Sequence, residues 1–198
     1  LMDYPSMAKD IVVIMQHLAI ESAIVLGHSM GGKIAMELAL TYPERLDKLI
    51  VADIAPVEYP PHHNQIIDGL KAIDLSSVKG RKDADKQLAN YVDNLSVRQF
   101  LLGNLTSKNG QFVFKCDIEN IDKNYPNIMR TYQGSNTYSG PTLFIKGANS
   151  DYILPEHRAE IVRLFPQSRA RVIQGAGHWL HAEKTKAFNR SVTSFLAT

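Results

Sequence analysis

Ser29 lies in a short motif that could supply a nucleophile. Residues 27–31 have the sequence GHSMG, a G-x-S-x-G pattern between a short apolar run and a stretch with helical spacing. A serine on such a strand-to-helix turn is held in a strained conformation with its hydroxyl projecting outward. Flanking glycines let the backbone approach closely, and amides at the start of a helix face the charge that develops on an attacked carbonyl. The motif therefore predicts a nucleophilic Ser29, with the Met30 N–H as an oxyanion donor.

A nucleophilic serine needs a base, and His178 is the best placed of the seven histidines. It follows residues 175–177, just after the last predicted strand, at the carboxyl edge where parallel sheets place ligands and catalysts. Two neighbours are candidates for the substrate pocket: His28, inside the motif, and Trp179, which we expect to pack under the imidazole. The sequence suggests no third ligand for the adjacent histidines at 62–63, so we expect no metal there.

The acid that orients the base has two candidates. Asp53 ends the strand that follows the serine motif, and Asp151 lies in the loop after the strand at 142–145. Both lie between Ser29 and His178 in the chain, and both follow predicted strands at their carboxyl ends. Spacing alone therefore leaves open which of the two aspartates orients the base.

Apolar runs and helical patterns alternate around these residues, as expected of a layered α/β fold with a mainly parallel sheet. Short all-apolar runs are typical of strands buried on both faces. The predicted strands are 23–26, 49–52, 142–145 and 170–173, and the predicted helices beside them are 7–18, 31–40, 155–165 and 183–196.

The pattern changes between residues 57 and 139, where prolines are followed by helical stretches at 64–73, 83–92 and 97–105 and by an exposed strand at 112–114. We therefore predict three parts, listed here: core 1–56, a mostly helical lid insertion 57–139 over the sheet, and core 140–198. Phe100 and Leu101 are candidates to line a pocket for an acyl chain, although a helix packed on the sheet edge fits their apolar helix equally well.

Four segments together resemble a known superfamily: 27–33 (GHSMGGK), 53–56 (DIAP), 147–150 (GANS) and 175–183 (GAGHWLHAE). They look like the α/β-hydrolases and, more closely, the bacterial YbfF-type esterases and their mitochondrial relatives. The resemblance implies a serine carboxylic-ester hydrolase that acts on small-molecule acyl esters or thioesters and uses no cofactor or metal. It also implies that Asp53, not Asp151, is the orienting acid.

The same resemblance implies a second oxyanion donor on an early strand that the 198 residues do not contain. We expect several N-terminal strands to be missing and the chain alone to be a poor catalyst, since one lost donor costs about a hundred- to a thousand-fold in rate. Lys33, in the helix after the motif, is expected to face solvent.

Composition excludes several other classes. The 198 residues are 44% hydrophobic and 21% charged, with a net charge of +2, which argues against disorder and against a nucleic-acid partner. No apolar run is long enough to span a membrane. We expect the single cysteine, Cys116, to have no catalytic role. Because one cysteine cannot form an internal disulfide, it also predicts a reducing compartment, the cytoplasm. Two alternatives to a serine esterase stay open: an α/β-hydrolase that cleaves carbon–carbon or amide bonds, and a catalytically silent protein that uses the hydrolase fold for binding. The sequence does not specify the oligomeric state.

Overall fold

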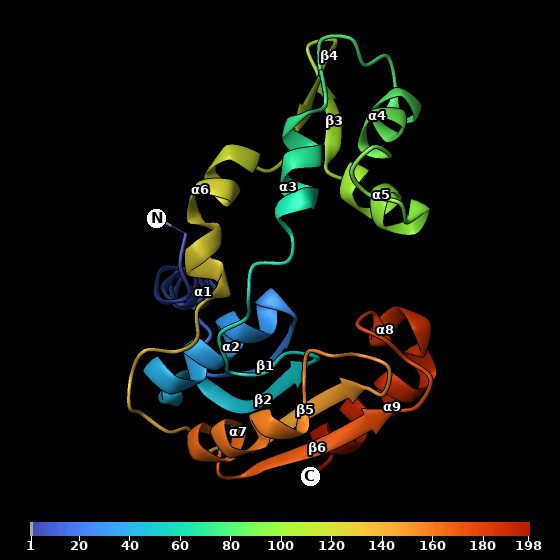
Figure 1. Ribbon diagram of the computed structural model, residues 1–198. Coiled ribbons are helices and arrows are strands. Elements are labelled where there is room, and N and C mark those ends of the chain that lie inside the picture. The colour runs from blue at the N-terminus through green and yellow to red at the C-terminus, as the bar shows by residue number, and fades with distance from the viewer. Residues whose placement is uncertain (1) are drawn as a thin grey trace. The chain divides into compact units, whose positions relative to one another are not determined.

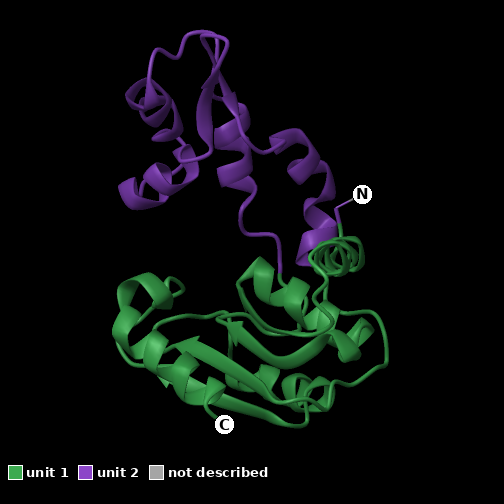
Figure 2. Cartoon of the chain, turned by 180° about the vertical axis from the view of Figure 1, so that it is seen from behind, with its two compact units in different colours: residues 1, 3–59, 130–198 green, residues 2, 60–129 purple. Residues whose placement is uncertain are grey.

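The computed structural model describes residues 2–198 and contains two compact units (Figures 1 and 2). Residues 3–59 and 130–198 form the first unit, and residues 60–129 belong to the second. The inserted unit is therefore shorter at both ends than the expected insertion at 57–139. Each unit has its own hydrophobic core.

The first unit is built on a parallel sheet with the strand order β1-β2-β5-β6, which confirms the predicted α/β class (Figure 1). The strands are β1 Ala23–His28, β2 Leu46–Ala52, β5 Thr142–Gly147 and β6 Ser168–Ile173. Each contains one of the four predicted apolar runs. Helices on both faces cover the sheet: α1 Tyr4–His17, α2 Met30–Thr41, α7 Arg158–Leu164, α8 Leu180–Glu183 and α9 Thr185–Leu196, with the short 3-10 turns η1 Pro43–Arg45 and η2 Pro155–His157.

Successive residues of β2 point into two different cores. Leu49 and Val51 pack in the cluster that contains residues of α1, α2 and α7, whereas Ile50 and Ala52 pack in the cluster with α8 and α9. All four are at most 1% exposed. Burial on both faces explains why this strand has an unbroken apolar sequence instead of an alternating one.

Strand β1 is less buried than β2 among the described residues. Ile24 and Leu26 are each 44% exposed. Among residues 2–198, β1 pairs with β2 alone. The burial expected of its apolar run therefore stays a prediction for the face that no described strand covers.

The second unit packs short helices around a two-stranded antiparallel hairpin. Its elements are α3 Asn64–Lys71, α4 Arg81–Leu88, α5 Leu95–Leu102, β3 Leu105–Lys108, β4 Gln111–Phe114 and α6 Ile118–Met129. The predicted helix at 97–105 is wrong at its end, because the chain turns at Gly103 and Leu105 begins β3. Helix α6 was not predicted, and it contains Pro126, a residue that normally interrupts a helix. No helix within residues 2–198 is long and apolar enough to cross a membrane.

Lys33 was predicted to face solvent, but the structure buries it. Its residue is only 6% exposed, and Nζ donates to the carbonyl oxygens of Val57 at 2.8 Å and Arg130 at 2.6 Å. The ammonium also lies over the rings of Tyr4 and Tyr59, 5.5 and 4.8 Å from their centroids. The two carbonyls belong to the two chain segments that lead into and out of residues 60–129. The lysine therefore links these segments to each other and to α2.

We expect Lys33→Met to change how stability depends on pH. Burial lowers the pKa of Lys33 to about 8, whereas the unfolded chain keeps the ordinary value of about 10.4. Between these values the unfolded state binds a proton that the folded state does not, so the native protein gains stability as pH rises from about 8 to about 10. Urea unfolding across this range should show that gain in the native protein and its loss in Lys33→Met. The exposed Lys9→Met is the control, and parallel curves for native protein and Lys33→Met would contradict the prediction.

Candidate active site

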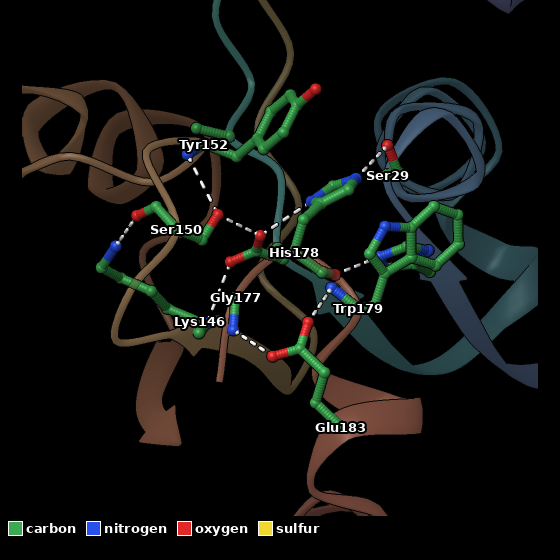
Figure 3. Close-up of polar contacts among 12 residues, drawn as sticks. Ser29, Lys146, Ser150, Tyr152, Gly177, His178, Trp179 and Glu183 are labelled. Atoms are coloured by element: carbon green, nitrogen blue, oxygen red, sulfur yellow. Dashed lines mark hydrogen bonds and ion pairs between the residues drawn. The ribbon is translucent and has the colours of Figure 1, made fainter. Parts of the chain in front are cut away.

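The carboxyl ends of the strands bring together residues that are distant in the sequence. His28 pairs with Ala52 and Ala52 pairs with Ile145, while Gly147 pairs with Ile173. In a parallel sheet all these strand ends lie at one edge. The loops that follow them contain the residues singled out by the sequence, and Figure 3 shows several of them around His178.

Ser29 occupies a strained turn between β1 and α2. Its φ of 55° and ψ of −124° lie in a region that non-glycine residues rarely adopt. The turn is held by main-chain hydrogen bonds: Ser29 N donates to Ala52 O at 3.0 Å, and Gly32 N donates to Ser29 O at 2.8 Å. Met30 is the first residue of α2, where a helix leaves its N–H groups without intrahelical acceptors.

The two glycines that flank the turn are not equally necessary. A Cβ added to Gly27 would lie 2.7 Å from Gly32 Cα and closer still to the carbonyl oxygen of Gly31. A Cβ on Gly31 would meet nothing within 4 Å. The expectation that both positions need glycine for close backbone approach is therefore supported at Gly27 and not at Gly31.

Gly27→Ala is expected to destabilise the protein by about 3 kcal/mol or more, because the new methyl group meets backbone atoms that cannot rotate away. Gly31→Ala is the matched control. It should stay within about 1 kcal/mol of the native protein, because alanine is favoured over glycine inside a helix. Urea unfolding of the two variants tests the difference, and equal stabilities would contradict the geometry of the turn.

Ser29, His178 and Asp53 form a continuous hydrogen-bonded chain, and Figure 3 labels Ser29 and His178. Nε2 of His178 lies 3.0 Å from Ser29 Oγ, and Nδ1 lies 2.8 Å from Asp53 Oδ2. The Asp53 carboxylate is fully buried, and it also accepts hydrogen bonds from Gly147 N at 3.0 Å and from the Ser150 hydroxyl. A buried carboxylate needs such donors because it has lost its water. These contacts fix the carboxylate against the imidazole.

The structure brings Asp53, and not Asp151, to His178. The Asp151 side chain is exposed, and Asp53 occupies the Nδ1 side of the imidazole. The loop after β5 contributes through Ser150 instead, whose hydroxyl donates to Asp53. The sequence pattern gave no sign of this role for Ser150.

The ring stacked on the imidazole of His178 belongs to Tyr152, with centroids 4.1 Å apart and planes 28° apart. Trp179 was expected in that place, but its ring lies edge-on to the imidazole at 5.9 Å and 70°. Tyr152 is in turn positioned by Tyr59, whose hydroxyl donates to the Tyr152 carbonyl. Tyr152 and Tyr59 were not identified from the sequence as site residues, because both lie far from His178 and from each other in the sequence.

The remaining pocket candidates lie in different surroundings. His28 Nε2 is 2.8 Å from the carbonyl oxygen of His178, and burial lowers the pKa of His28. Trp179 is 37% exposed. Phe100 and Leu101 lie on α5 of the second unit, where Phe100 is 58% exposed and Leu101 packs against that unit's core. Their assignment to a substrate pocket stays a prediction.

The polar groups at this edge suit nucleophilic chemistry. A hydroxyl, an imidazole and a buried carboxylate in series form an arrangement that can deprotonate a serine as it attacks. No group of three or more His, Cys, Asp or Glu side chains that could hold a metal ion occurs within residues 2–198.

Comparison with known proteins agrees with the fold. The family model described as alpha/beta hydrolase fold matches residues 2–90. Esterase YbfF of Escherichia coli is 37% identical, over 98% of this chain and 75% of its own. The chain belongs to the α/β-hydrolase family, which confirms the resemblance seen in the sequence.

Two further relatives are similar over nearly the whole chain. The sn-1-specific diacylglycerol lipase ABHD11 of Mus musculus is 40% identical over 98% of this chain. The solved structure of a marine microorganism esterase superposes with a TM-score of 0.95 at 41% identity, covering 98% of this chain and 78% of that one. The chain spans 65% of the length of the mouse relative.

Proposed function

We propose that the protein is a serine carboxylic-ester hydrolase that acts on small-molecule acyl esters and also on acyl thioesters. The observation that supports this most is the position of His178, which joins the Ser29 hydroxyl to the buried Asp53 carboxylate. The names of the relatives, two esterases and a lipase, support the same reaction class. The single cysteine, Cys116, which is free, supports the cytoplasm as its compartment.

In the proposed mechanism Ser29 Oγ attacks the ester carbonyl carbon while Nε2 of His178 takes the hydroxyl proton. Asp53 accepts from Nδ1–H, which selects the tautomer with a free Nε2 and stabilises the imidazolium that forms. The Met30 N–H at the start of α2 donates to the oxyanion. The tetrahedral intermediate collapses, and the leaving alcohol or thiol takes the proton from Nε2.

The acyl group is then bonded to Ser29 Oγ, and water completes the reaction. His178 removes a proton from the water as it attacks the acyl carbonyl, and returns that proton to Ser29 Oγ as the acid leaves. No metal or cofactor has a role in these steps.

Rapid-mixing kinetics with p-nitrophenyl esters test the acyl-enzyme directly. The protein that contains these 198 residues should release p-nitrophenol in a burst close to one equivalent per Ser29 when deacylation is slower than acylation. A series of acyl lengths, with matched thioesters and amides, then defines the substrate class. Hydrolysis of amides but not of esters would contradict the proposal.

A further inference from the structure

Glu183 contacts the backbone on both sides of His178. It is the last residue of α8, and its Oε2 accepts from Gly177 N at 2.7 Å while its Oε1 accepts from Trp179 N at 3.2 Å (Figure 3). One carboxylate therefore uses both of its oxygens on the two amides that flank His178. Neither amide belongs to a regular helix or strand.

The carbonyl between these two amides is held from the other direction. His28, on the strand that leads to Ser29, places Nε2 2.8 Å from His178 O. Three main-chain groups of residues 177–179, Gly177 N–H, His178 C=O and Trp179 N–H, are thus bound by two side chains from separate elements. Because Gly175 has a φ of 68° and Gly177 also lacks a side chain, the loop has few restraints of its own.

We propose that Glu183 is a positioning residue, which fixes the backbone of His178 so that Nε2 stays in line with Ser29 Oγ, with His28 as its counterpart on the opposite side. The inference rests on the proposed function, since it assumes that His178 is the base. Glu183 is exposed, so its hydrogen bonds add little to global stability. A displacement of about 1 Å of a catalytic group can nevertheless cost about a hundredfold in rate.

The chemistry of the contact requires a carboxylate. Two N–H donors need two acceptors, and a glutamine offers one oxygen and an NH₂ that would face the second N–H. Glu183→Gln therefore keeps the size and shape of the side chain but loses one of the two contacts.

The test compares Glu183→Gln with Glu21→Gln, an exposed glutamate at the opposite end of β1, in the protein that contains these residues. Two rates are measured: kcat for a p-nitrophenyl ester and the rate of Ser29 labelling by a fluorophosphonate. We expect both to fall about 10- to 100-fold in Glu183→Gln, with KM and melting temperature nearly unchanged. Native rates in Glu183→Gln would overturn the proposal.

A double-mutant cycle separates positioning of His178 from a general structural effect. In a His178→Ala background, Glu183→Gln should cause no further loss of the residual hydrolysis, because the residue it positions is absent. A loss of the same size in both backgrounds would overturn the inference while leaving the proposed function intact. Undiminished activity of His178→Ala itself would instead refute the proposed function.

His28→Phe provides a second variant, should Glu183→Gln lower the melting temperature. It keeps a ring in the same place and removes the donor to His178 O. The expected result is again a loss of kcat that disappears in the His178→Ala background, and an equal loss in both backgrounds would count against the proposal.

Discussion

Ser29→Ala is expected to lower kcat for ester hydrolysis by about 10⁶-fold, the largest effect of any single change in the chain. The substitution removes the only atom that forms the bond to the acyl group in the proposed mechanism, Oγ, which lies 3.0 Å from His178 Nε2. The turn itself should persist, since its hydrogen bonds are made by main-chain atoms of Ser29. Steady-state kinetics with a p-nitrophenyl ester, together with a melting curve, provide the measurement.

Ser22→Ala serves as the matched control. Ser22 is exposed beside the other end of β1, where its hydroxyl donates to Asp47, and its loss should leave kcat within about twofold of the native value. Retention of more than a tenth of native activity by Ser29→Ala would show that another group is the nucleophile.

Asp53→Asn is expected to lower kcat by about 10⁴-fold without unfolding the protein. An asparagine would present either an amide NH₂ or a neutral oxygen to Nδ1, so the tautomer with a free Nε2 and the imidazolium both lose their support. Asp53 is fully buried and accepts three hydrogen bonds, and asparagine can keep only part of this set. Melting curves must therefore accompany the kinetics.

Asp151→Asn is the decisive comparison, because spacing alone did not separate the two aspartates. Its side chain is exposed, and we expect kcat to remain within about twofold of the native value. If Asp151→Asn abolished activity while Asp53→Asn preserved it, the orienting acid would have to be reassigned to Asp151.

The parts of the fold that could be predicted from the sequence are those with strong local signals. Residues 49–52 form an unbroken apolar run because β2 is buried on both faces, and the motif at 27–31 marks a strand-to-helix turn. The same kind of run at 23–26 also forms a strand, β1, in parallel pairing with β2.

The parts that could not be predicted depend on contacts between distant residues. Lys33 is buried because carbonyls of Val57 and Arg130 replace its water, and no local pattern indicates that geometry. Tyr152 stacks on His178 from a loop 26 residues earlier in the chain, 178 − 152. In the second unit, α6 was missed because Pro126 interrupts the helical pattern.

Intact-mass analysis after exposure to a fluorophosphonate tests the central claim, that Ser29 is a nucleophile activated by His178, most directly. We expect a single adduct in the protein that contains these residues, mapped by peptide analysis to Ser29 and absent from His178→Ala. An unlabelled protein that is shown to be folded, or an adduct on a residue other than Ser29, would contradict the account.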